Sequence, residues 1–144
     1  MKARIRFFTE NVPGSVRGKR KLAAWFNRVL EGEGKAPGDI NIVLCDDIFL
    51  ADLNLKYLKH KTLTDILTFP FEEESGHICG DIYISQPRVI ENAEKFQQDP
   101  EMELHRVMIH GILHLAGYRD KTPGEKKLMR EAENRCLAML DEIQ

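Results

Sequence analysis

The sequence predicts one α+β domain over residues 1–144, with a small mixed sheet of about four strands packed against about five helices. The chain of 144 residues is 42% hydrophobic and 31% charged, which suits a single hydrophobic core. Short apolar runs rich in β-branched residues occur as far as Ser85, and beyond it apolar residues recur at helical spacing. We find no repeat or linker-like tract that would divide the chain.

The first part of the chain is predicted to form a strand, a helix and a second strand. Ala3 to Phe8 alternates basic and apolar residues, which is typical of a strand with one solvated face. A helix is expected over Ser15 to Leu30, where apolar residues recur every three or four positions. The loop Glu31 to Gly38 contains three glycines and a proline, and Ile40 to Cys45 has the composition of a buried strand.

The middle of the chain is predicted to form a helix followed by two strands. Either Asp46 or Asp47 can cap the helix, because a short side-chain oxygen accepts hydrogen bonds from the first free backbone amides. The two strands are expected over Ile66 to Phe69 and over Ile78 to Ser85. Pro70 is expected to close the first of them, because proline cannot donate to the ladder.

Three helices are predicted to complete the domain. Ser85 can cap the first of them. The second begins at residues 99–101, where a capping Asp is followed by Pro and Glu, and Gly117 can end it in a left-handed conformation. Residues 122–125, Thr-Pro-Gly-Glu, have the form of a capping box that opens the last helix.

The motif HxxxHxxGxxD in the second of these helices predicts a metal site. His110 and His114 are four residues apart and therefore project from one helix face, at a spacing that lets two imidazoles bind one ion. After Gly117 the chain can turn back and bring Asp120 to the same point. Three ligands leave a fourth position open, as in catalytic sites. The alternative, a solvated pair of histidines, is disfavoured by the apolar residues around them.

Gly111 bears on the reaction that such a site would catalyse. A zinc peptidase with this ligand spacing would have a Glu next to the first His as its general base. The chain has Gly111 there, so the standard peptidase mechanism lacks its proton acceptor. Hydrolysis of a phosphodiester depends more on charge neutralisation and an activated water, and it fits the residues better.

Charge and cysteine content limit the possible partners and compartment. The net charge is −2, so any RNA binding must use a local basic patch. The three cysteines are widely spaced without a CxxC motif, which indicates structural thiols in a reducing compartment. No apolar run reaches the length of a membrane span, and the N-terminus lacks the apolar region of a signal peptide. We therefore expect a cytoplasmic protein without membrane contact.

Three segments resemble the YbeY family of bacterial single-strand-specific metal-dependent endoribonucleases. Residues 110–118, HGILHLAGY, resemble the family signature HGxLHLxGYDH. Residues 64–70, TDILTFP, follow Asn54-x-x-Tyr57 and resemble the family segments T-D-V-L-S-F-P and N-x-x-Y-R. Residues 80–85, GDIYIS, resemble the family strand G-D-I-x-I-S.

The resemblance implies a hydrolase of RNA that acts in maturation of the 16S rRNA 3′ end and in ribosome quality control. It implies one Zn²⁺ per chain bound by His110, His114 and Asp120, with other divalent transition metals as alternatives. The partners would be single-stranded rRNA and the small ribosomal subunit or its assembly factors. Thr64 and Asp65 would either line the groove or cap a turn.

The chain departs from the family at two positions. The family usually has His where this chain has Asp120, and Arg where it has Leu58. Basic residues elsewhere must then contact phosphates, and the candidates are Lys56, Lys59, Lys61 and Arg106. Two other functions stay open: a ribosome-associated RNA-binding protein with a structural metal, and a metallohydrolase of another substrate such as peptides.

Overall fold

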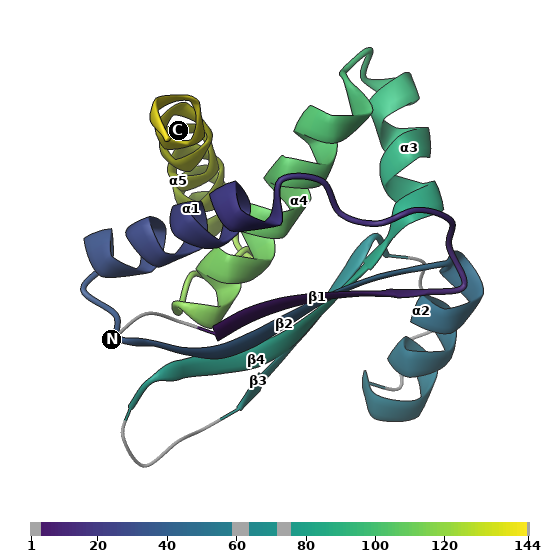
Figure 1. The fold of residues 1–144 in the computed structure, drawn as a ribbon, viewed down its shortest axis with the longest axis horizontal. Coiled ribbons are helices and arrows are strands. Elements are labelled where there is room, and N and C mark those ends of the chain that lie inside the picture. Colours follow the sequence, from purple (N-terminus) through teal and green to yellow (C-terminus); the bar gives the residue numbers. More distant parts are fainter. Residues whose placement is uncertain (1–3, 59–63, 72–75, 144) are drawn as a thin grey trace.

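The computed structural model describes residues 4–58, 64–71 and 76–143 and shows a four-stranded mixed sheet between helices (Figure 1). The strands are β1 (Arg4–Glu10), β2 (Pro37–Cys45), β3 (Ile66–Phe71) and β4 (Ile78–Ser85). Their order in the sheet is β1-β2-β4-β3. The pairs β1–β2 and β2–β4 are parallel, and the edge strand β3 is antiparallel to β4. The predicted α+β class with a small mixed sheet is confirmed.

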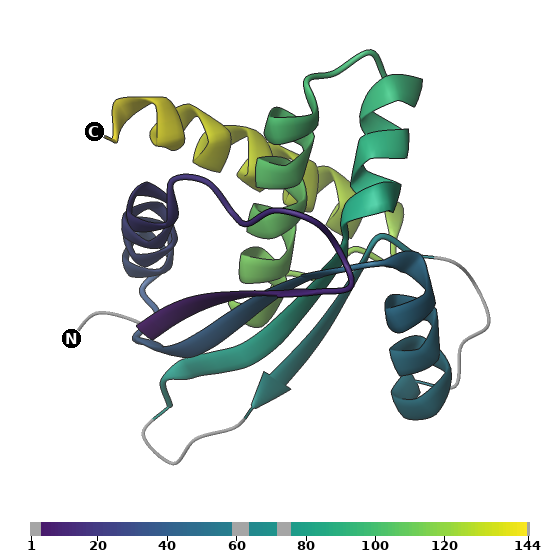
Figure 2. The ribbon, with the colours of Figure 1, turned by 45° about the vertical axis from the view of Figure 1, so that its right-hand side comes forward.

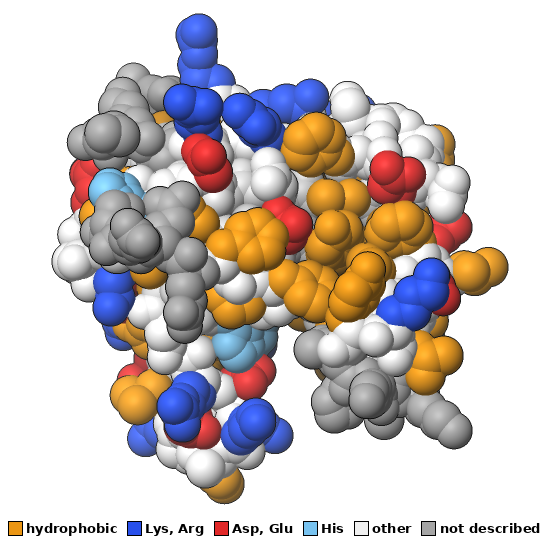
Figure 3. Space-filling view, turned by 90° about the horizontal axis from the view of Figure 1, so that it is seen from below, with side chains coloured by type: hydrophobic (Ala, Val, Ile, Leu, Met, Phe, Trp, Pro, Cys, Tyr) orange, Lys and Arg blue, Asp and Glu red, His pale blue; other side chains and the backbone are white. Residues whose placement is uncertain are grey.

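The helices divide unequally between the two faces of the sheet, as Figures 1 and 2 show. One face is covered by four helices, α1 (Lys19–Gly32), α3 (Gln86–Lys95), α4 (Pro100–Leu115) and α5 (Pro123–Glu142). Of the described helices, only α2 (Asp47–Leu53), continued by the π-helical turn η1 (Asn54–Leu58), lies on the other face. Figure 3 shows that open face, where hydrophobic side chains gather between charged ones.

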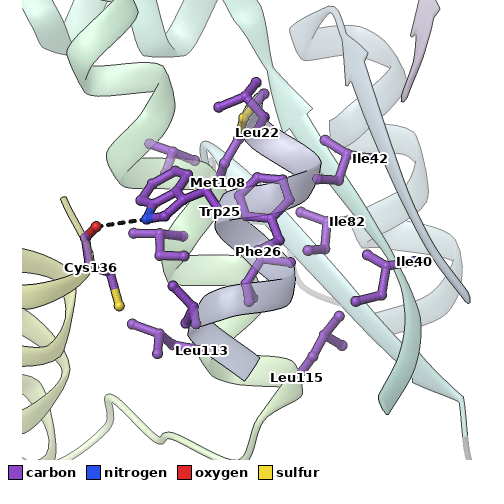
Figure 4. Packing of buried hydrophobic residues seen from close by; sticks show 14 of the residues in the cluster. Leu22, Trp25, Phe26, Ile40, Ile42, Ile82, Met108, Leu113, Leu115 and Cys136 are labelled. Atoms are coloured by element: carbon purple, nitrogen blue, oxygen red, sulfur yellow. Dashed lines mark hydrogen bonds between the residues drawn. The ribbon is translucent and has the colours of Figure 1, made fainter. Parts of the chain in front are cut away.

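The main core lies between the sheet and the four-helix layer. Trp25 and Phe26 of α1 are fully buried and meet Ile42 and Ile82 of the sheet and Met108 of α4 (Figure 4). The indole Nε1 of the same tryptophan donates a 2.7 Å hydrogen bond to the backbone carbonyl of Cys136, which ties α1 to α5. Burial of this apolar surface is the main stabilising contribution to the fold.

Two glycines let α4 lie close to the sheet. A Cβ atom on Gly111 would come within 2.9 Å of Ile82 Cγ2 on β4. A Cβ atom on Gly80 would come within 2.8 Å of Leu115 Cδ2 on α4. Close packing of α4 on β4 therefore explains why a glycine lies inside this helix, although glycine has a low helix propensity.

The predicted helix starts are mostly confirmed by their caps. Asp46, and not Asp47, caps α2 by accepting from the backbone amide of Phe49. Ser85 caps α3, and Asp99 caps α4. The capping box at the start of α5 is present in full.

Several predicted boundaries are wrong, and β2 begins at Pro37, inside the segment predicted as a loop. The helix expected from Ser15 begins at Lys19, because Gly18 has a left-handed φ of 67°. Strand β3 continues through Pro70 to Phe71. A proline is tolerated there because β3 is an edge strand, so one side of its backbone needs no ladder hydrogen bond.

All three cysteines are buried and none of them forms a disulfide, as predicted. Burial raises the pKa of Cys45 to about 12 and that of Cys136 to about 11. Both side chains are therefore protonated, unreactive core residues at neutral pH. Among the described helices, none is long and apolar enough to cross a bilayer.

Candidate metal centre

Helix α4 brings the two histidines of the motif together near its C-terminal end. His110 and His114 are one helical turn apart, and their ring centroids lie 4.6 Å from each other. Both side chains are about one-quarter exposed, so they are accessible from solvent while their rings rest on the protein. The predicted pair on one helix face is present.

The turn after α4 returns the chain to this pair. Gly117 has a φ of 110°, and its amide donates to the carbonyl of His114. The amide of Tyr118 donates to the carbonyl of Leu113, and the two bonds together form a Schellman motif. Asp120 follows, and its Oδ2 atom lies 3.3 Å from His110 Nε2 and 3.4 Å from His114 Nε2.

The three donor atoms fit one transition-metal ion. Each of the residues His110, His114 and Asp120 offers a ligand atom, and these atoms lie within 4.8 Å of one another. Zinc bonds of about 2.0–2.1 Å in a tetrahedron require ligand atoms about 3.3 Å apart, which agrees with the two measured separations from the Asp120 oxygen. Two imidazoles and a carboxylate are also a donor set that zinc accepts.

A buried carboxylate on α5 lies behind the first histidine. Glu133 is 5% exposed, and its Oε2 atom lies 2.7 Å from His110 Nδ1. If Nδ1 carries the proton and donates it to Glu133, the Nε2 lone pair faces Asp120 and is free for a metal. A carboxylate behind a ligating histidine fixes its tautomer and ring orientation in this way.

The protonation of this pair follows from its surroundings. Burial alone would lower the pKa of His110, but the hydrogen bond and charge of Glu133, with Asp120 and Asp65, raise it. Burial would raise the pKa of Glu133, but hydrogen bonds from His110 and Arg106 lower it. Glu133 is therefore a carboxylate at neutral pH.

The basic residues singled out for RNA contact have different surroundings. Arg106 donates to Glu133 Oε1 at 3.0 Å and to Asn134 Oδ1 at 2.9 Å, so it holds α4 against α5. Lys56 forms a 3.0 Å ion pair with Asp52 one turn earlier in the helix. Lys59 and Lys61 lie outside the described residues.

A cavity of about 310 Å³ adjoins the candidate metal centre. His110, Asp120 and Glu133 contribute to its wall, and so does Asp65, which directly precedes β3. Burial raises the pKa of Asp65, although His110 and Arg88 oppose the shift. Thr64 is not part of this wall, and its hydroxyl donates to the backbone carbonyl of Ile66, as in a turn cap.

Sequence reasoning missed Glu133. The residue lies on the buried stripe of the last helix, four positions after Met129, where an apolar side chain is expected. A charged residue on such a stripe is the signal that could have found it, because a buried charge needs a partner.

The family model and the relatives that match this chain have the same name. The family model described as Endoribonuclease YbeY matches residues 10–141. A relative from Parabacteroides distasonis, named Endoribonuclease YbeY, is 44% identical over 138 residues, 96% of each chain. One from Phocaeicola vulgatus with the same name is 43% identical over 136 residues, 94% of this chain and 98% of its own.

A solved structure shares the fold. The solution structure of TM1509 from Thermotoga maritima matches with a TM-score of 0.63 and 31% sequence identity, over 94% of this chain and 88% of that one. Fold and site together define a single-domain α+β protein with a candidate metal centre on a helix–turn segment. Because the family model matches most of the chain, this chain belongs to the Endoribonuclease YbeY family.

Proposed function

We propose that this protein is a metal-dependent endoribonuclease that cuts single-stranded RNA during maturation of the 16S rRNA 3′ end and in ribosome quality control. The observation that carries the proposal is the convergence of His110 Nε2, His114 Nε2 and Asp120 Oδ2 in a member of this family. We propose zinc as the ion, with one site per chain.

The chain's own residues bind and orient the reacting groups. His110, His114 and Asp120 would hold the ion, and Glu133 would fix the ring of His110. When bound, a divalent ion supplies positive charge for the phosphodiester and an activated water for its hydrolysis. Gly111 faces β4 at close range, so this helix position has no room for the general base of a peptidase.

Asp65 is our candidate for the proton acceptor. It lies in the wall of the same cavity as His110 and Asp120. Because burial raises its pKa towards neutrality, the Asp65 carboxylate is a stronger base than an exposed Asp.

The partners and the compartment belong to the same proposal. We propose that the substrate is presented by the small ribosomal subunit or its assembly factors, in the cytoplasm. Three buried cysteines without a disulfide are consistent with a reducing compartment. Lys56, Lys59, Lys61 and Arg106 remain candidates for phosphate contact, and Arg106 would have to combine this role with its bonds to Glu133 and Asn134.

The test measures metal content and cleavage of a single-stranded 16S rRNA fragment in parallel. We expect about one ion per native chain, loss of both metal and cleavage in Asp120→Ala, and loss of cleavage with metal retained in Asp65→Asn. Asp141→Ala, which removes an exposed carboxylate near the end of α5, is the control and should retain both properties.

Two outcomes would instead support one of the two alternative functions. Metal bound without any RNA cleavage, with unfolding on metal removal, would indicate an RNA-binding protein with a structural metal. Cleavage of casein but not of RNA would indicate a peptidase.

A further inference from the structure

We propose that the groove between α4 and α5 binds the unpaired RNA segment next to the scissile phosphate. This inference rests on the proposed endoribonuclease function and extends it by assigning a path for the strand. Apart from His110, the helix residues that it concerns lie outside the family motifs quoted above.

Two helix faces form the part of the groove nearest the metal ligands. Each contributes four residues at the spacing i, i+3, i+4 and i+7, which is one stripe of a helix. The residues are Glu103, Arg106, Val107 and His110 of α4, and Lys126, Met129, Arg130 and Glu133 of α5. Both stripes line the 310 Å³ cavity, so this cavity extends along the helices from the metal ligand His110.

A second cavity, of about 490 Å³, continues the groove away from the metal ligands. Glu103, Arg106 and Arg130 line both cavities, so the two cavities are neighbours along the same pair of helices. The residues that only the second cavity contains are mostly apolar: Phe96, Gln98, Met102 and Leu137. Volumes of this size are in the range of about 300–1,000 Å³ that is typical of small-ligand pockets.

The groove is lined by side chains of both charges, and its cations differ in how they are paired. Lys126 and Arg130 are exposed, and no described carboxylate lies within ion-pair distance of either side chain. They are one turn apart on the face of α5 that meets the cavity. Arg106, in contrast, is already paired with Glu133. Glu103 lines the same cavity; burial raises the pKa of its carboxyl, and the charges of Arg106 and Arg130 oppose that shift. Lys126 and Arg130 are the cations of this wall that form no ion pair among the described residues, and they can contact a backbone that leaves the metal centre.

The far end of the groove suits an unpaired base. Phe96 is 61% exposed and Met102 is 58% exposed, and both border the second cavity. An exposed aromatic ring near exposed cations is an arrangement that stacks bases of single-stranded nucleic acid without sequence preference. A duplex cannot use it, because its bases are already stacked on one another.

The experiment compares cleavage kinetics of the zinc-loaded protein on a fluorescent single-stranded RNA. The groove variants are Lys126→Glu with Arg130→Glu, and Phe96→Ser. The matched control is Lys127→Glu with Arg135→Glu, which reverses two exposed charges of the same helix that line neither groove cavity. All variants should retain the native metal content and melting temperature.

We expect the charge-reversal groove variant to raise KM at least tenfold with kcat changed less than twofold. The slope of log KM against log salt should fall by about 1.4, because two phosphate contacts to a single strand are lost. Phe96→Ser should raise KM about fivefold or more through the loss of stacking. The control should behave as the native protein does.

Equal KM values in the groove variant and the control, with native cleavage intact, would overturn the assigned path and leave the endoribonuclease function standing. If the native protein neither binds nor cuts RNA, the proposed function fails and the path fails with it. Groove variants that cut RNA normally but lose binding of a peptide would also overturn the assignment to RNA.

Discussion

Glu133 Oε2 lies 2.7 Å from His110 Nδ1, so a carboxylate of the last helix sets the orientation of a histidine of the candidate metal centre on the helix before it. The other oxygen of the same carboxylate accepts from Arg106, one turn away from His110 on α4. The metal centre therefore depends on the packing of α4 against α5 as well as on its own ligands.

Replacing Glu133 by Gln should weaken zinc binding about 10- to 100-fold, because loss of a partner behind a ligating histidine typically has this effect. The amide keeps the shape of the side chain but removes the charge that stabilises the proton on Nδ1. Competition with a chromophoric chelator measures the change. Glu131→Gln, an exposed neighbour, is the control, and an unchanged zinc affinity in Glu133→Gln would contradict the role of this carboxylate.

The stabilisation that zinc adds to the folded protein should grow as pH rises above 6.5. The pKa of His110 is raised from 6.5 in the folded protein, so in the metal-free protein its pair with Glu133 stabilises most below 6.5. That contribution is lost as pH rises through the raised pKa. Zinc needs the neutral ring, so its stabilising effect grows over the same range.

Melting temperatures of both forms from pH 6 to pH 8 test this expectation. The separation between the two curves should widen with rising pH and should shrink in Glu133→Gln. If the melting temperatures of the two forms of the native protein change equally with pH, then His110 does not lose a proton when the metal binds.

Replacing Gly111 by Ala should destabilise the protein despite the better helix propensity of alanine. The new Cβ would come within 2.9 Å of Ile82 Cγ2, and Ile82 is fully buried. Overpacking costs about 1–3 kcal/mol, and propensity offsets about 1 kcal/mol of it. Chemical denaturation measures the net loss.

Gly124→Ala is the matched control for this change, because nothing lies within 4 Å of a Cβ at that helical position. It should not destabilise the protein. Adding Ile82→Val to Gly111→Ala should restore part of the stability by removing a crowding methyl group, whereas a fully stable single variant would refute close packing of α4 on β4.

Replacing Thr122 by Ala should reduce both stability and zinc affinity. Thr122 and Glu125 form the capping box of α5, two residues after Asp120. Loss of such a cap costs about 0.5–2 kcal/mol, and it frees the turn that presents the Asp120 carboxylate. Asp99→Ala removes a cap of the same kind at the far end of α4 and should cost similar stability with native zinc affinity.

The local part of this architecture was predictable from the sequence. Helix caps such as Asp46 and Thr122 act on backbone amides within a few residues, so short patterns predict them. The spacing of His110 and His114 on one helix is equally local. The ion pair between Lys56 and Asp52 follows the same i, i+4 rule and could have been expected.

What the sequence did not predict depends on the tertiary structure. The contact of Glu133 with His110 joins two helices, and it arises only from the angle at which they pack. Pro70 could remain in a strand because β3 is at the sheet edge, which is a property of the sheet order rather than of the segment. Local composition contains neither piece of information.

The turn that presents Asp120 has a consequence for how this site can change over generations. Its start is set by backbone hydrogen bonds of Gly117 and Tyr118, and its end by Thr122 and Glu125. None of these bonds uses the side chain of residue 120. A substitution at this position therefore leaves the backbone path of the turn unchanged. Aspartate and histidine codons differ by a single base. Lineages can therefore exchange an oxygen donor for a nitrogen donor in one mutational step, and adjust metal preference to the metals available, without rebuilding the fold.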